Sequence, residues 1–134
     1  MVFGTFDIFH SGHENFLQQA RQYGDYIVAV IARDATVAVI KGKAPKNNEA
    51  QRARILADSH LVDEVIFGSL GDKYEVIAKH RPEIICLGYD QNAFTDNLVS
   101  QLERLGLEKT KIIRLNPFQP ELYKSSIISE ERKK

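Results

Sequence analysis

Short apolar runs alternate with amphipathic stretches along the whole chain. The apolar runs predict strands over residues 1–3, 26–32, 62–67, 83–87 and 111–115. Apolar side chains at helical spacing predict helices over residues 13–23, 49–59, 72–80, 94–105 and 125–132, with a short helix or turn at 34–40. The run YIVAVIA at 26–32 is typical of a strand covered on both faces. The first strand is so short that it either begins abruptly or lacks residues upstream.

This alternation predicts an α/β fold, because strands that alternate with helices form a parallel sheet with helices on both faces. Right-handed crossovers then give one Rossmann-like doubly wound domain over residues 1–134, with a five-stranded parallel sheet. Ligands of such sheets bind beyond the carboxyl ends of the strands. Three polar loops follow predicted strands there, at residues 4–13, 33–48 and 88–92.

The amino-acid composition limits the classes of partner that the chain is expected to bind. Eighteen basic residues balance eighteen acidic ones, so net charge gives no reason to expect nucleic acid or an anionic membrane surface. An anionic ligand must therefore be held by a local site. No apolar stretch approaches the 18 or more residues of a membrane span, and the short strand and polar turn at the start lead us to expect no signal peptide.

Several residues outside the polar loops are expected to have structural and not chemical roles. Cys86 stands alone inside an apolar run, so it is expected to be an inert core residue, and a reducing cytoplasm is the simplest compartment. Phe16, Phe67 and Phe94 are also expected in the core, and His60 and His80 at the surface or at helix ends.

The loop GTFDIFHSGH, residues 4–13, carries the strongest chemical signal. Gly4 lets backbone approach a ligand, and the following helix N-terminus offers free amides to a phosphate. His10 and His13 are spaced so that both can face one ligand. Transfer of a phosphoryl or nucleotidyl group depends on charge stabilisation and positioning, which two imidazoles would supply. The alternatives are surface or helix-capping histidines, or a zinc site completed by Cys86 and a carboxylate.

GTFDxxHxGH resembles the signature of the cytidylyltransferase-like family of HxGH nucleotidyltransferases, and the resemblance extends over nearly the whole chain. It implies catalytic roles for His10, His13 and Lys41, the lysine of VIKGK that grips substrate phosphates. It implies nucleotide or phosphate binding by further residues of the turn, namely Gly4, Thr5, Phe6 and Gly12. Lys43 would assist Lys41, and a plain surface loop is the alternative for both lysines.

The resemblance also implies roles for Arg52, as structural support of the site or a phosphate contact, and for Asp34, as an acidic residue near the site. A solvated helix face is the alternative for Arg52. Asp7 is either a site residue or only an Asx-type turn residue. Gly88 and Asp90 would contact the nucleotide, unless they form a plain strand-to-helix turn.

The segment KSSII near the end of the chain falls where relatives hold a triphosphate. Ser125 and Ser126 would bind phosphate there, and a helix N-cap is compatible with that role. Lys124 would contact phosphate or solvent.

The implied mechanism is direct in-line attack of an acceptor phosphate on the α-phosphorus of an NTP, with release of pyrophosphate. Mg²⁺ would bridge the phosphates without a dedicated protein site. The combination of IARD, VIKGK, QR, FGSL and LGYDQ resembles small archaeal-type FAD synthases, which implies ATP as donor and FMN as acceptor. The alternatives are glycerol-3-phosphate cytidylyl transfer from CTP, sugar-phosphate adenylyl transfer, and a nucleotide sensor without turnover. A homodimer is implied by the resemblance alone.

Overall fold

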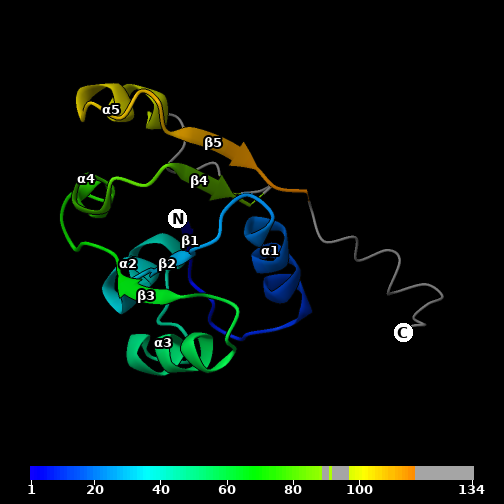
Figure 1. Ribbon diagram of the computed structural model, residues 1–134. Helices are drawn as coiled ribbons and strands as arrows, with labels where there is room; N and C mark the ends of the chain where they lie inside the picture. The colour runs from blue at the N-terminus through cyan, green and yellow to red at the C-terminus, as the bar shows by residue number, and fades with distance from the viewer. Residues whose placement is uncertain (89–90, 92–96, 117–134) are drawn as a thin grey trace.

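The computed structural model describes residues 1–88, 91 and 97–116 of the chain. The strands are β1 (Val2–Gly4), β2 (Val28–Ile31), β3 (Glu64–Phe67), β4 (Ile84–Leu87) and β5 (Lys111–Arg114). The helices are α1 (Ser11–Arg21), α2 (Asp34–Lys41), α3 (Glu49–Asp58), α4 (Glu75–His80) and α5 (Leu98–Arg104) (Figure 1). The helix predicted over 125–132 lies outside the described residues, and the single domain over 1–134 stays a prediction.

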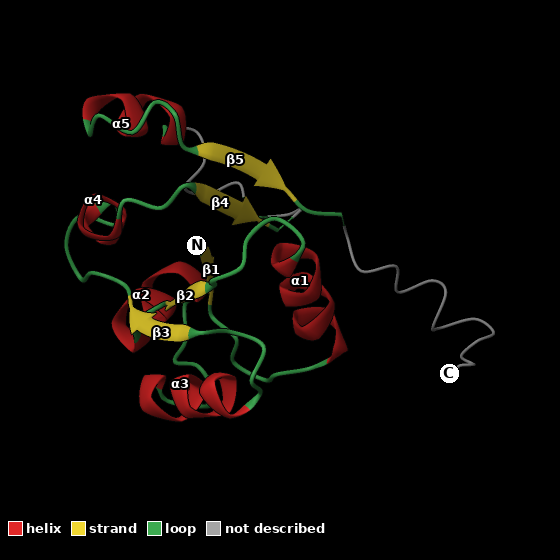
Figure 2. Ribbon diagram, viewed as in Figure 1, coloured by secondary structure: helices red, strands yellow, loops and turns green. Residues whose placement is uncertain are grey.

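The strands form one parallel sheet in the order β3-β2-β1-β4-β5. The chain winds outward from β1 through β2 to β3, and then crosses to the other side of β1 to add β4 and β5 (Figure 2). This arrangement confirms the doubly wound prediction. The winding direction changes between β1 and β4, where the register pairs Val2 with Cys86. Ligands are therefore expected beyond the carboxyl ends of these two central strands.

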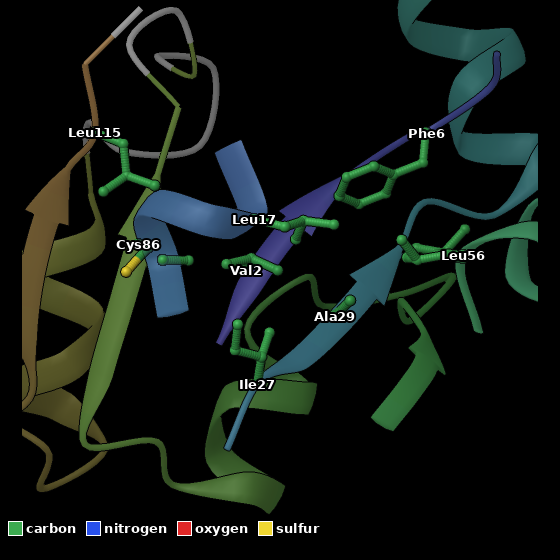
Figure 3. Packing of buried hydrophobic residues seen from close by; sticks show 10 residues of the cluster. Val2, Phe6, Leu17, Ile27, Ala29, Leu56, Cys86 and Leu115 are labelled. Atoms are coloured by element: carbon green, nitrogen blue, oxygen red, sulfur yellow. The ribbon is translucent and has the colours of Figure 1, made fainter. Parts of the chain in front are cut away.

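Two apolar clusters cover the two faces of the sheet, because successive side chains of a strand point to opposite sides. On β4, Cys86 belongs to the cluster under α1 and α3, whereas Ile85 and Leu87 belong to the cluster under α4 and α5. Figure 3 shows the first cluster, in which Leu17 of α1 packs toward Val2 between the central strands. Burial on both faces explains why the inner strands β2 and β4 are uninterrupted apolar runs in the sequence.

Some sequence predictions need correction. Phe67 was expected in the core, but it is 40% exposed because it ends the edge strand β3. Phe16 packs partly buried against the first cluster, Cys86 is buried as predicted, and Phe94 lies outside the described residues. Lys41 was assigned to a loop, whereas it is the last residue of α2, which ends at the left-handed Gly42.

Helix starts were also misplaced. The first helix begins at Ser11 rather than at residue 13, because His10 caps it. The fourth begins at Glu75 rather than at residue 72, because the Asp72 carboxylate accepts a hydrogen bond from the Tyr74 amide in a preceding turn. Within the described ranges, no helix is long and apolar enough to cross a membrane.

Candidate active site

The candidate site lies at the carboxyl ends of the central strands. Residues 4–13, which we call the histidine turn, leave the end of β1, and Gly88 and Gln91 follow β4. The Gln91 amide joins the two strands, since its Nε2 donates to the Phe3 carbonyl at 2.7 Å and its Oε1 accepts from the Gly88 amide at 2.7 Å. The histidine turn and the start of the loop after β4 are therefore held side by side at the point where the winding reverses.

The two histidines cap α1 reciprocally. The Nδ1 atom of His10 accepts from the Gly12 amide at 3.0 Å, and the Nδ1 atom of His13 accepts from the His10 amide at 3.2 Å. Their rings stack with centroids 4.0 Å apart. A neutral imidazole that accepts through Nδ1 carries its hydrogen on Nε2. The capping interpretation is therefore correct for Nδ1, and it leaves each Nε2–H as a donor for a ligand.

His13 is held neutral at physiological pH. Its pKa is lowered from 6.5 to about 4, first by burial and then by the electrostatic effect of the neighbouring His10 and Lys41 side chains. The ring is half-buried between Phe6 and Phe9, with centroids at 5.3 and 5.5 Å. A neutral ring in this position can donate one hydrogen bond, through Nε2–H.

The start of the histidine turn is shaped by its own packing. A Cβ atom at Gly4 would lie 2.8 Å from Cε2 of Phe6, so packing of the Phe6 ring by itself favours glycine here. Phe6 is buried and adopts a left-handed backbone conformation with φ of 51°. Contact of a nucleotide with Phe6 would therefore involve its backbone. The Thr5 carbonyl is directed to Arg52.

Arg52 supports the site from beneath. Its side chain is 0% exposed, and each guanidinium nitrogen bonds to protein. Nε donates to the Asn47 carbonyl at 3.0 Å, Nη1 to the Thr5 carbonyl at 2.8 Å, and Nη2 to the Asp34 carboxylate at 2.7 Å. These bonds join α3 to the histidine turn, to α2 and to the segment between α2 and α3. A phosphate has no access to the guanidinium in this conformation, so the geometry favours the supporting role.

Asp34 and Asp7 both accept hydrogen bonds from other segments. The bond from Arg52 is the main cause that holds the pKa of Asp34 below its usual range. Asp7 accepts from the backbone amides of Lys46 and Asn47, so it is more than a local turn residue. Lys41 and Lys43 are exposed, and the charge of Lys41 contributes to the lowered pKa values of Asp7 and His13. Four predicted site residues lie outside the described ranges: Asp90, Lys124, Ser125 and Ser126.

A zinc site at the two histidines was the alternative to a phosphate site, and it would need further ligands nearby. Across the described ranges, no three His, Cys, Asp or Glu side chains are grouped so that they could hold a metal ion. Cys86, the third ligand that the sequence offered, is buried in the cluster under α1. Among the described residues, the histidine pair has no third side chain grouped with it as a zinc ligand.

A hollow of about 620 Å³ opens at the opposite ends of the strands, beside Tyr26, Glu64 and His80. It is lined by the starts of β2 and β4 and is remote from the histidine turn. The hollow is therefore not the candidate active site, because doubly wound sheets bind ligands at the carboxyl ends of their strands.

Known proteins resemble this chain in sequence and in fold. Residues 1–131 match the cytidylyltransferase-like family. The chain belongs to this family. An FAD synthase of Thermoplasma volcanium is 37% identical over 131 residues, covering 98% of this chain and 91% of the relative. An FAD synthase of Pyrococcus abyssi is 40% identical over 125 residues, covering 92% of this chain and 81% of the relative.

A solved structure also matches. The lipopolysaccharide core biosynthesis protein from Thermoplasma volcanium superposes with a TM-score of 0.82 at 37% identity, over 89% of this chain and 96% of that one. The fold and the family confirm the sequence prediction that the protein is a nucleotidyltransferase.

Sequence reasoning missed two residues, Glu49 and Gln91, that hold the candidate site together. Glu49 of α3 binds the start of α2, since its carboxylate accepts from the Asp34 amide at 2.8 Å and pairs with Arg33 at 2.9 Å. Gln91, in the bridge described above, was noted only as part of a motif. A signal existed for α3, because Asn48 and Gln51 have the spacing of a capping box and form one. No sequence signal links Gln91 to Phe3.

Proposed function

We propose that the protein is an FAD synthase, which transfers AMP from ATP to FMN and releases pyrophosphate. The observation that carries the proposal is the pair of imidazoles at the N-terminus of α1, each capping through Nδ1 and each with Nε2–H left to donate. The helix dipole adds positive potential at the same place. The FAD synthases that resemble this chain over 81–91% of their own length support ATP and FMN as substrates.

The proposed reaction is one in-line displacement. An oxygen of the FMN phosphate attacks the α-phosphorus of ATP, and a new P–O bond forms as the bond to the β-phosphate bridging oxygen breaks. Pyrophosphate leaves with that electron pair. The donor enters as its magnesium complex, with the ion held mainly by phosphate oxygens and water. Orientation of the two phosphates contributes roughly 7 kcal/mol or more to lowering the barrier of such a reaction.

The protein residues act on the phosphate charge. The Nε2–H groups of His10 and His13 donate to phosphate oxygens, and Lys41 and Lys43 add positive charge. A donor aimed at developing charge in a transition state contributes on the order of 10²–10³ in rate. His13 is neutral before substrate binds, because its pKa is about 4. Arg52 supports the histidine turn, and Gln91 joins Gly88 at the end of β4 to Phe3 of β1.

Pyrophosphate release tests the substrate choice. ATP and CTP are crossed against FMN and glycerol 3-phosphate in the presence of Mg²⁺. Release with ATP and FMN alone is the expected result. Release with CTP and glycerol 3-phosphate alone would instead make the protein a cytidylyltransferase. Binding of ATP without release in any pairing would favour the nucleotide sensor.

A cytoplasmic homodimer is also proposed. Exposed apolar side chains on α2, Val39 at 84% and Ile40 at 69%, support a partner surface. Cys86 is free and buried, which suits a reducing compartment. Light scattering coupled to gel filtration should give twice the mass of the chain, whereas a monomeric mass would contradict the dimer.

A further inference from the structure

Asp7 joins two parts of the site that are far apart in sequence. Its Oδ2 accepts from the Lys46 amide at 2.9 Å and its Oδ1 accepts from the Asn47 amide at 2.8 Å. The donors lie 39 and 40 residues further along the chain. They belong to residues 41–48 (KGKAPKNN), which we call the lysine segment. The carboxylate thus connects the histidine turn to the segment that carries Lys41 and Lys43.

The connection is closed into a ring of hydrogen bonds. Asn47 Nδ2 donates to the Asp7 carbonyl at 2.6 Å, so the two residues bind each other through backbone and side chain. The Asn47 carbonyl accepts from Arg52, which also binds the Thr5 carbonyl. The ring runs from Thr5 through Arg52 and Asn47 to Asp7. Bonds arranged in this way reinforce one another, and the fully buried Arg52 anchors them to α3.

The ring of hydrogen bonds restricts the position of the lysine segment. The lysine segment is fixed at one end where α2 stops at Gly42, and at the other where Asp7 holds Lys46 and Asn47. Lys43 lies between these two points and is exposed. The two backbone amides also hold the pKa of Asp7 below its usual range, so the carboxylate remains a full acceptor at neutral pH. Charge from Lys41 reaches both Asp7 and His13.

We propose that Asp7 is a positioning residue whose carboxylate latches the lysine segment onto the histidine turn, so that Lys41, Lys43 and the two imidazoles face the same phosphate groups. Its role in catalysis rests on the proposed nucleotidyl transfer. Asp7 itself touches no substrate in this account. Misplacement of charged groups by about 1 Å costs on the order of 10²-fold in rate, which is the loss that the latch prevents.

The latch is tested first without turnover, by amide hydrogen exchange at Lys46 and Asn47. Asp7→Ala should raise exchange at both amides by about tenfold or more, and Asp7→Asn should raise it less because one carbonyl oxygen still accepts. Asp58→Asn is the matched control, because it removes an exposed carboxylate at the end of α3 and should change neither amide. Unchanged exchange at 46 and 47 in Asp7→Ala would overturn the latch, whatever the enzyme does.

Positioning is tested by coupling to a lysine. Asp7→Ala and Lys43→Ala are each expected to lower kcat/KM for pyrophosphate release by about tenfold or more. The double variant should lose much less than the product of the two factors, because an unlatched segment has already misplaced Lys43. Strict multiplication of the two losses would refute positioning. Absence of turnover in the parent protein would count against the proposed function, while the exchange result would still decide the latch.

Discussion

Arg52 is the residue on which the integrity of the site depends most. It is fully buried, and its guanidinium bonds to the Thr5 and Asn47 carbonyls and to Asp34. Arg52→Ala removes a charged donor from all three partners and leaves space beneath the histidine turn. We therefore expect a large loss of stability that is centred on the site.

The size of the loss follows from the partners. Removal of one member of a buried ion pair costs about 3–5 kcal/mol. The Asp34 side chain is 39% exposed and is rehydrated in the variant, which places the expected cost near the lower limit, at roughly 3 kcal/mol. Arg52→Lys keeps the charge, but a compact ammonium cannot span three partners, so about 1–2 kcal/mol is expected. Arg54→Ala, an exposed position on the same helix, should stay within about 0.5 kcal/mol.

Urea unfolding followed by circular dichroism measures these differences. With an m-value of about 2 kcal/mol per molar, a loss of about 3 kcal/mol lowers the midpoint by about 1.5 M. The reasoning fails if Arg52→Ala costs less than about 1 kcal/mol, or if it costs no more than Arg54→Ala. Either result would mean that the guanidinium bonds contribute little to the folded state.

Three further predictions concern the histidine turn. His10→Ala and His13→Ala should each lower kcat by about 10²-fold or more with little change in the circular dichroism spectrum, and full activity in either variant would remove that histidine from the chemistry. The pKa of His13 is about 4 in the folded protein and 6.5 ordinarily, so the unfolded chain binds the proton more readily and stability should fall as pH drops from 6.5 to 4. The shift in pKa corresponds to a loss of about 3 kcal/mol in the free energy of unfolding, and partial exposure of the ring reduces this loss to on the order of 1 kcal/mol. In His13→Gln, the urea midpoint should depend less on pH across this range. Gly4→Ala should lose about 1–3 kcal/mol in thermal unfolding, because the new Cβ would meet Phe6 at 2.8 Å, whereas Gly24→Ala has nothing within 4 Å and should lose little.

The sheet could be predicted from the sequence, because burial on both faces gives the inner strands continuous apolar runs. The apolar run of β4 serves one cluster through Cys86 and the other through Ile85 and Leu87, so no polar position interrupts it. The alternation with helices then fixes a parallel arrangement. The edge position of β3 was harder to predict, because Phe67 continues the apolar run of Val65 and Ile66. Its exposure depends on the strand order.

The histidine turn could be predicted from its own residues, but its partners could not. Arg52 and Arg54 look alike in EAQRARIL, and only Arg52 lies under the histidine turn. The spacing of Arg52 to Leu56, one helical turn along, was the available signal, since Leu56 is also buried. The bonds from Asp7 to residues 46 and 47 have no such signal, because nothing local in either segment specifies a contact across 39 or 40 positions.

The proposed activity is the transfer of AMP from ATP onto FMN. Incubation with ATP labelled at the α-phosphate, followed by chromatography of the flavins, tests it most directly. Label from the α-phosphate is expected to enter FAD, and label from the γ-phosphate is expected to leave in pyrophosphate. His10→Ala and His13→Ala should abolish most of both. Label that never enters the flavin while ATP binding persists, or transfer that survives the loss of both histidines, would contradict this proposal.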